Sequence, residues 1–214
     1  LCWAAKMSNK AVFTGVVLAG GQSSRMGSDK ANLILKNKTL LQNACELLTA
    51  AGASDLLISR NVQSATAQYI ADIYPGSGPL GGIYSTLMAT EQDILVTAVD
   101  MPLLTCTLLS QIASAGSDNS HFQTNQPQIH AWHFENEPLP LYIRNTQSVK
   151  RHLKQLLINV NSHKSIKQFT RSIGVQTLKC NKAHALINTN TPAQFNAVNE
   201  QFDQHKPNLL RRTL

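Results

Sequence analysis

The chain has 214 residues, 43% of them hydrophobic and 14% charged, and its 19 Lys and Arg against 12 Asp and Glu give a net charge of +7. This length and apolar content predict one domain with its own core, and no apolar run approaches the roughly 20 residues needed to cross a bilayer, which argues against a membrane protein. The positive charge favours anionic partners, but the basic residues are dispersed without interleaved aromatic residues, which argues against nucleic acid as a partner.

Both ends of the chain are predicted to lie outside the functional domain. Residues 1–6 precede the first methionine, Met7, and are too short for a signal peptide, so we expect them to be a cloning remnant. One functional domain is predicted over residues 7–205, followed by a basic tail over residues 206–214.

Hydrophobic periodicity predicts the following elements in chain order. Short apolar runs predict buried strands over Phe13–Leu18, Asp55–Ser59, residues 94–99 and Val175–Leu178. Helical spacing of apolar residues predicts helices from Leu40 to a stop at Gly52, around residues 65–70, onward from Ile83, over residues 108–113, over residues 148–157 and after the cap Thr191. Glycine-rich residues 76–82 are predicted to be a loop, and polar residues 117–137 a loop, an edge hairpin or a substrate-facing flap. The alternation of strands and helices predicts an α/β fold with a parallel, doubly wound sheet.

Cysteine and histidine residues show no spacing typical of a metal site. The four cysteines are scattered without a CxxC pair, so neither a disulfide framework nor a zinc site is expected, and a cytoplasmic location is predicted. Of the seven histidines, His121, His130 and His133 fit no compact ligand set, and surface or loop positions are predicted for them.

The residues that carry chemistry are densest directly after the first predicted strand, where residues 18–30 read LAGGQSSRMGSDK. Because Gly20 and Gly21 lack a Cβ, the backbone there can turn tightly and aim its amides at base or phosphate oxygens. Arg25 and Lys30 add positive charge. An ordinary strand-loop-helix turn with solvated basic residues is the alternative, but the combination favours nucleotide binding.

Two further segments suggest ligand contacts. Asp100 follows the strand of residues 94–99, so its carboxylate should lie at the carboxyl edge of the sheet and hold Mg²⁺ against phosphates, unless it caps the next helix instead. Asn188 and Asn190 alternate around Thr189, so in an extended segment both face the same side, whereas an Asn-rich turn before Thr191 is the alternative.

These residues resemble the molybdenum cofactor guanylyltransferase (MobA) family, whose signature LAGGxSxRMGxDK is matched at every fixed position from Leu18 to Lys30. The resemblance continues through residues 78–82 (GPLGG), 99–102 (VDMP) and 188–192 (NTNTP). It implies a single Rossmann-like, three-layer nucleotidyltransferase domain with a mostly parallel sheet, and GTP lying across the carboxyl ends of the strands.

The resemblance also assigns roles to individual residues. It implies that Arg25, Lys30 and Asp100 are catalytic and that Asp100 is the ligand of Mg²⁺. The implied GTP and pterin contacts are Leu18, Ala19, Gly20, Gly21, Lys30, Asp72, Gly82, Asp100, Asn188 and Asn190. The two asparagines are assigned to molybdopterin, while a solvated loop position is the alternative for Asp72 and a plain glycine-rich connection the alternative around Gly82.

The implied reaction joins two anionic substrates. The phosphate of molybdopterin attacks the α-phosphorus of GTP and expels pyrophosphate, while Mg²⁺ at Asp100, Arg25 and Lys30 neutralise charge. The expected partners are therefore GTP and molybdopterin, with molybdoenzyme chaperones as further candidates, and neither nucleic acid nor a membrane.

Two features depart from the family pattern. Where the second strand ends, the family usually places a nucleotide-binding asparagine, but this chain has Ser59, and Asn61 is the candidate substitute. Residues 117–137 match the family poorly, before residues 138–142 (PLPLY) recover a family-like strand.

Three other functions stay open. CMP transfer to the same pterin is less favoured, because those relatives typically begin Leu-Ala-Ala-Gly where this chain has Gly20 as the third residue. A sugar-phosphate nucleotidyltransferase usually spaces its glycine loop and basic residues differently. A non-catalytic member that binds GTP or a chaperone is suggested by Ser59 and by the divergent residues 117–137.

Overall fold

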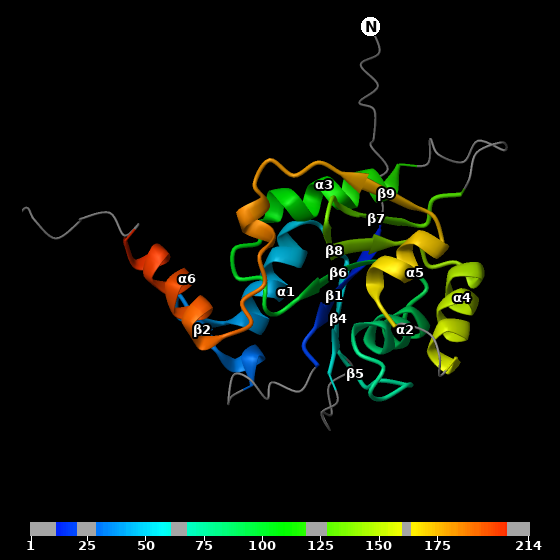
Figure 1. The fold of residues 1–214 in the computed structure, drawn as a ribbon, viewed down its shortest axis with the longest axis horizontal. Coiled ribbons are helices and arrows are strands. Elements are labelled where there is room, and N and C mark those ends of the chain that lie inside the picture. The colour runs from blue at the N-terminus through cyan, green and yellow to red at the C-terminus, as the bar shows by residue number, and fades with distance from the viewer. Residues whose placement is uncertain (1–11, 21–28, 61–67, 119–127, 160–163, 205–214) are drawn as a thin grey trace, which may run out of the picture.

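Helices cover both faces of a central sheet in three layers (Figure 1). The computed structural model describes residues 12–20, 29–60, 68–118, 128–159 and 164–204, without the side chains of residues 201–204. The helices are α1 (Leu40–Ala50), α2 (Pro79–Ala89), α3 (Cys106–Ser117), α4 (Gln147–Ile158), α5 (Ile166–Ser172) and α6 (Pro192–Gln204), with 3-10 turns η1 (Lys30–Asn32) and η3 (Ala183–Leu186). Helices α1 and α3 pack on one face of the sheet, and α2 and α4 lie on the other. The predicted α/β, three-layer fold is confirmed.

The central sheet has seven strands in the order β5-β4-β1-β6-β8-β7-β9. They are β1 (Phe13–Leu18), β4 (Asp55–Ser59), β5 (Tyr69–Ile70), β6 (Asp93–Ala98), β7 (Ala131–Phe134), β8 (Glu137–Ile143) and β9 (Val175–Leu178), while β2 (Ile34–Leu35) and β3 (Lys38–Thr39) form a separate hairpin. Strands β5, β4, β1 and β6 run parallel, β8 is antiparallel to both of its neighbours, and β7 is parallel to β9. Because the chain leaves β1 first toward β4 and later reaches β6 on the other side, a crevice is expected at the carboxyl ends of these three strands.

The continuously apolar strands occupy the middle of the sheet, as the sequence predicted. Every residue of β1 is buried, because helices cover both faces of a parallel sheet. Helix α1 begins after Thr39, whose hydroxyl accepts a hydrogen bond from the Gln42 amide, while Gln42 Oε1 accepts one from the Thr39 amide. The helix ends at Ala50, just before Gly52 takes a φ of 103°, so the predicted helix and its stop at Gly52 are confirmed.

The start of α2 and the segment before it differ from the prediction. The helix expected around residues 65–70 is wrong at its described end, because Tyr69 and Ile70 form β5 on the edge of β4; residues 61–67 lie outside the described residues. Helix α2 begins at Pro79 rather than at Ile83, since proline suits a first helical position and its missing amide costs no helical hydrogen bond there. Gly82 therefore lies inside the helix and not in a loop.

The polar segment of residues 117–137 contributes to a hairpin. Residues 119–127 lie outside the described residues, but β7 and β8 pair through a turn at Asn136, which takes a φ of 65°. The edge-hairpin alternative is wrong in its position, because β9 pairs with the free side of β7 and the hairpin therefore lies inside the sheet. The strand predicted over residues 138–142 is confirmed as part of β8.

One hydrophobic cluster runs from Phe13 in β1 to Val198 in α6. Trp132 and Tyr142, the largest side chains without solvent exposure, lie in the hairpin half of the sheet and meet edge to face. Within the described ranges, no helix has the length and apolar character that a bilayer crossing requires.

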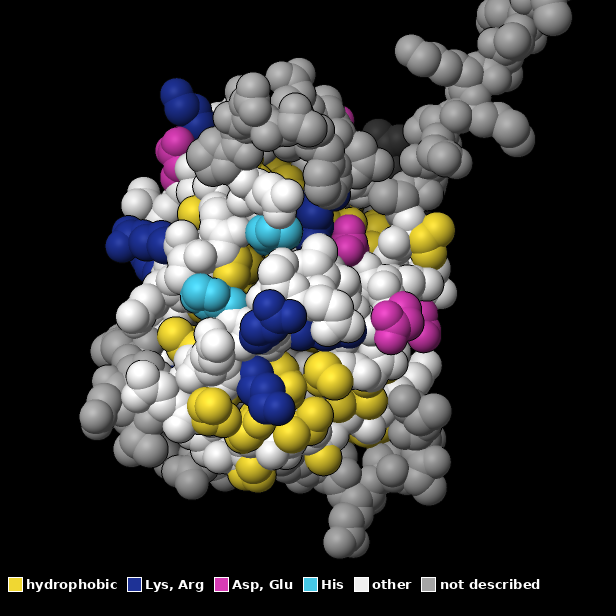
Figure 2. Space-filling view, turned by 90° about the vertical axis from the view of Figure 1, so that its right-hand side faces the viewer, with side chains coloured by type: hydrophobic (Ala, Val, Ile, Leu, Met, Phe, Trp, Pro, Cys, Tyr) yellow, Lys and Arg dark blue, Asp and Glu magenta, His cyan; other side chains and the backbone are white. Residues whose placement is uncertain are grey.

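The face that carries α4 is basic. Helices α4 and α5 contain five Lys and Arg residues, Lys150, Arg151, Lys154, Lys167 and Arg171, and neither contains Asp or Glu. Figure 2 shows this side of the molecule, where dark-blue basic side chains lie next to an apolar patch.

Candidate active site

The carboxyl ends of β1, β4 and β6 lie side by side. The Ala19 amide donates to the Ser59 carbonyl at 3.0 Å, and the Val99 amide donates to the Leu18 carbonyl at 3.2 Å. Leu18 and Ala19 therefore occupy the middle of this edge, and the chain leaves it through Gly20. Gly21, Arg25 and Asn61 lie outside the described residues.

Lys30 brings three separate segments together at this edge. Its Nζ donates to Asp100 Oδ2 at 3.3 Å, to the Thr189 carbonyl at 3.1 Å and to Asn190 Oδ1 at 3.0 Å. The Lys30 and Asp100 side chains are 17% and 19% exposed, so their ion pair is partly shielded from water. The end of the glycine-rich motif, the turn after β6 and the segment before α6 thus meet at one ammonium group.

The two carboxylate oxygens of Asp100 differ in their hydrogen bonding to the described residues. Its Oδ2 accepts from Lys30, whereas its buried Oδ1 has no hydrogen-bond partner among the described residues. Helix α3 is capped by Thr105, whose hydroxyl accepts from the Leu108 amide, so Asp100 does not cap it. A buried carboxylate oxygen without a donor is a hard ligand suited to Mg²⁺.

The segment before α6 is held against the turn that contains Asp100. Both the amide and the hydroxyl of Thr189 donate to the Asp100 carbonyl, at 2.8 and 3.3 Å. Thr189 is buried while Asn188 and Asn190 are exposed, which confirms that the two asparagines alternate around it. Thr191 accepts from the Gln194 amide and caps α6, as predicted.

Asp72 and Gly82 lie beside the end of β4. The Ser59 hydroxyl, which is buried, donates to Asp72 Oδ1 at 3.4 Å. Gly82 packs so closely that a Cβ there would overlap Ser59 Oγ and lie 3.2 Å from Leu18 Cδ2. Gly82 thus lets α2 approach the sheet, and Ser59 orients the carboxylate of Asp72.

Sequence reasoning missed one ion pair at this edge. The Arg60 guanidinium, in the residue after β4, pairs with Asp29 Oδ2 immediately before Lys30. Asp29 is a fixed position of the motif and was a detectable candidate, whereas no sequence signal distinguished Arg60 from a solvated loop residue.

His130 and His133 lie at β7, which is separated from β6 by β8. His133 is buried in β7, where its Nδ1 donates to the Phe134 carbonyl at 2.7 Å, so the surface or loop position predicted for it is wrong. Its position follows from the hairpin, since every residue of β7 is buried. His130 lies half-buried just before β7, and burial, with the nearby Arg144 charge, lowers its pKa. His121 lies outside the described residues, among which no group of three or more His, Cys, Asp or Glu side chains could hold a metal.

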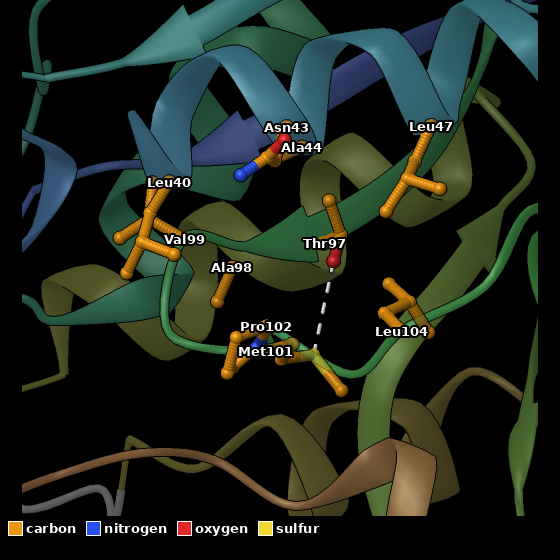
Figure 3. Close-up of a pocket in the computed structure, with 10 residues that line it drawn as sticks. All are labelled: Leu40, Asn43, Ala44, Leu47, Thr97, Ala98, Val99, Met101, Pro102 and Leu104. Atoms are coloured by element: carbon orange, nitrogen blue, oxygen red, sulfur yellow. Dashed lines mark hydrogen bonds between the residues drawn. The ribbon is translucent and has the colours of Figure 1, made fainter. Parts of the chain in front are cut away.

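A small pocket lies on the α1 side of the same turn (Figure 3). It is lined by Leu40, Asn43, Ala44, Leu47, Thr97, Ala98, Val99, Met101, Pro102 and Leu104. The Thr97 hydroxyl points across it and donates to Met101 Sδ at 3.7 Å. Since this lining carries no charged side chain, the pocket is a poor site for phosphates, and the polar edge at Lys30 and Asp100 is the better candidate.

Comparison with known proteins gives concordant matches. A family model described as a MobA-like NTP transferase domain matches residues 15–173. The chain is 34% identical over 190 residues to the molybdenum cofactor guanylyltransferase of Xanthomonas euvesicatoria pv. vesicatoria, covering 87% of this chain and 94% of that protein. It is 31% identical over 209 residues to the probable molybdenum cofactor guanylyltransferase of a Nostoc species, covering 91% and 94%. Its fold is similar to that of molybdopterin-guanine dinucleotide biosynthesis protein A from Archaeoglobus fulgidus, with a TM-score of 0.68 at 19% identity, covering 90% of this chain and 100% of that one.

Proposed function

Because this chain belongs to the MobA-like NTP transferase domain family, and is therefore a nucleotidyltransferase, we propose that it transfers GMP from GTP to molybdopterin and releases pyrophosphate. The observation that carries the proposal is the convergence of Asp100, Thr189 and Asn190 on Lys30. This contact joins the motif that would hold the nucleotide to the segment proposed for the pterin. The names of the two relatives, which match nearly their full lengths, support the same reaction.

Asp100 is the proposed ligand of Mg²⁺. Its buried Oδ1, which accepts no hydrogen bond from the described residues, fits a hard cation, and the Lys30 ammonium on its other oxygen keeps the carboxylate oriented. When bound, Mg²⁺ would supply positive charge to the phosphates of GTP. The family resemblance, in addition to this free oxygen, supports the assignment.

Lys30 and Arg25 are the proposed electrostatic groups. The three present acceptors of Lys30 are a carboxylate, a carbonyl and a side-chain amide, and a phosphate oxygen is a strong acceptor that can take the place of any of them. The backbone of Leu18, Ala19, Gly20 and Gly21 is proposed to line the nucleotide, because it forms the end of the central strand of the crevice and the turn that follows.

The reaction needs positioning more than proton transfer. A phosphate oxygen of molybdopterin forms a bond to the α-phosphorus of GTP, the bond between the α-phosphorus and the bridging oxygen to the β-phosphate breaks, and pyrophosphate leaves with that electron pair. The second pKa of a phosphate monoester is about 6, so the attacking phosphate is largely a dianion at neutral pH and needs no general base. Lys30 and Arg25 would stabilise the negative charge that builds on the leaving group.

The remaining proposed contacts fit the two substrates. The acceptor-only carboxylate of Asp72, held by Ser59, suits the N–H groups of guanine or a ribose hydroxyl. Gly82 brings the first turn of α2 close to the same strand end. The exposed amides of Asn188 and Asn190 offer donors and acceptors to the pterin or its phosphate.

The test is magnesium-dependent pyrophosphate release from GTP, compared with CTP and ATP, in the presence of molybdopterin. We expect GTP to be preferred, and Asp100→Ala to lower kcat by about 100-fold or more, as is typical when one electrostatic group is removed from such a site. Asp55→Ala, at the opposite end of β4, is the matched control and should keep wild-type activity. Preference for CTP, or nucleotide binding without turnover, would contradict the proposal.

A further inference from the structure

Asp29 and Lys30 form a bridge over the carboxyl end of β1. Asp29 pairs with Arg60, which follows β4, and Lys30 pairs with Asp100, which follows β6. Strand β1 lies between those two strands, so their ends are about 10 Å apart, two interstrand spacings. Two neighbouring residues can span this distance because Arg60 and Lys30 both have long side chains.

The carboxylate of Asp29 is fully engaged within the protein. Its Oδ1 accepts from the Ala31 amide at 3.1 Å, which makes Asp29 the cap of the η1 turn that begins with Lys30. Its Oδ2 accepts from Asn32 Nδ2 at 3.3 Å and from Arg60 Nη2. Since both oxygens have donors, the role of this carboxylate is to fix the backbone of η1, and with it the base of the Lys30 side chain.

Arg60 is itself held at a fixed place. Its amide donates to the Ile70 carbonyl at 3.0 Å, which ties it to β5, and its side chain is only 18% exposed. The preceding residue, Ser59, accepts from the Ala19 amide, so the end of β4 also anchors the start of the motif. The backbone of Arg60 is therefore fixed, and its guanidinium is partly shielded from water, while the partner Asp29 is 36% exposed.

We propose that Arg60, acting through Asp29, is a positioning residue that holds the Lys30 ammonium in place for the triphosphate. The inference rests on the proposed function, since it assumes that Lys30 binds the phosphates. Lysine has a flexible four-carbon side chain, so fixing its backbone removes part of the entropy cost of placing its charge. Arg60 also neutralises the Asp29 carboxylate, which would otherwise repel phosphates near Lys30.

A mutant cycle in GTP turnover separates this role from direct contact. We expect Arg60→Ala to lower kcat/KM for GTP by about 10- to 100-fold, a typical loss when a catalytic group is misplaced by about 1 Å, and Arg60→Lys to restore part of it. In a Lys30→Ala background, Arg60→Ala should have no further effect. Effects that multiply would mean that Arg60 binds the nucleotide itself, and would overturn the proposal.

A second measurement needs no nucleotide. Acetylation of Lys30 by an N-hydroxysuccinimide ester, followed by peptide mass spectrometry, should be several-fold faster in Arg60→Ala and Asp29→Asn than in the wild type, relative to the exposed Lys38. Arg151→Ala on α4 is the control and should leave the rate unchanged. Circular dichroism checks that each variant is folded. If Arg60→Ala is unstable, Asp29→Asn still tests the ion pair, because asparagine keeps a side-chain oxygen that can cap η1.

The two measurements keep this inference and the proposed function apart. An unchanged Lys30 acetylation rate in both variants would overturn the positioning role, whatever the enzyme activity. A wild-type protein that does not turn over GTP would contradict the proposed function alone, because the acetylation rates would still report whether Arg60 and Asp29 hold Lys30.

Discussion

The Ser59 hydroxyl and the absence of a side chain at Gly82 set the distance between α2 and the end of β4 at the candidate site. Because a Cβ at position 82 would overlap Ser59 Oγ, Gly82→Ala should destabilise the protein by about 1–3 kcal/mol, measured by urea unfolding. Adding Ser59→Ala removes the nearest atom and should recover part of the loss. An additive loss in the double variant would show that Ser59 is not the obstacle.

Among the residues that the structure describes, none would overlap a methyl group added at Gly20. A Cβ there would lie 3.6 Å from the Ser59 carbonyl oxygen, an ordinary contact, so Gly20→Ala should fold with an unchanged melting temperature. If the backbone of Gly20 lies against the guanine nucleotide, the added methyl group should clash with the ligand. Gly20→Ala should then lower kcat/KM for GTP relative to CTP by at least about tenfold. Equal losses for GTP and CTP would show that this position does not select the base.

His130 predicts a pH dependence of stability. Its pKa in the folded protein is lowered, first by burial and then by Arg144, although Asp93 opposes the shift. The unfolded chain therefore binds a proton on His130 more readily than the folded protein does. The neutral His130 contributes its full stabilisation of the fold above its ordinary pKa of about 6.5, and this contribution is lost as the pH falls from there through the lowered pKa of the folded protein. We expect the free energy of unfolding to decline more steeply between pH 7 and 5 in the wild type than in His130→Gln. Parallel curves would contradict this assignment.

At the scale of elements, the residues that cap α6 also hold Asn190, which is proposed to contact molybdopterin. Thr191 accepts from the Gln194 amide, and Gln194 Oε1 accepts from the amides of both Asn190 and Thr191. Thr191→Ala should cost about 1 kcal/mol of stability and loosen Asn190, raising the KM for molybdopterin more than the KM for GTP. Steady-state kinetics with each substrate varied in turn checks this, and a rise confined to GTP would move Asn190 to the nucleotide side.

The elements that the sequence predicted well are those set by local pattern. Strands β1, β4 and β9 were predicted with their bounds, and helix α1 with its stop at Gly52, because a continuous apolar run or a glycine after a periodic run is a local signal. Strand β5 has only two residues and exists through pairing with β4, so no periodicity could reveal it. The family resemblance assigned Lys30 and Asp100 to one site, whereas their direct ion pair and the Arg60 contact depend on long-range geometry that no local signal shows.

At the scale of the whole molecule, positive charge should accelerate the encounter with anionic substrates. The net charge of +7 is concentrated in part on α4 and α5, and both proposed substrates are anionic. We expect kcat/KM for GTP to fall as NaCl rises from 0.05 to 0.5 M, since the screening length is about 10 Å at 0.1 M, while kcat stays nearly constant. An equal fall in kcat and kcat/KM would show that salt acts on the chemical step instead.

The two ends of the seven-stranded sheet have a consequence for behaviour in concentrated solution. One outer strand, β5, has only two residues and the other, β9, has four, with the side chain of Gln176 turned back to the Trp132 indole. Long unpaired backbone edges recruit strands from other molecules and start aggregation, and short ones offer little to add to. The order of the strands thus places the long, apolar ones in the middle, where they cannot template association between copies of the chain.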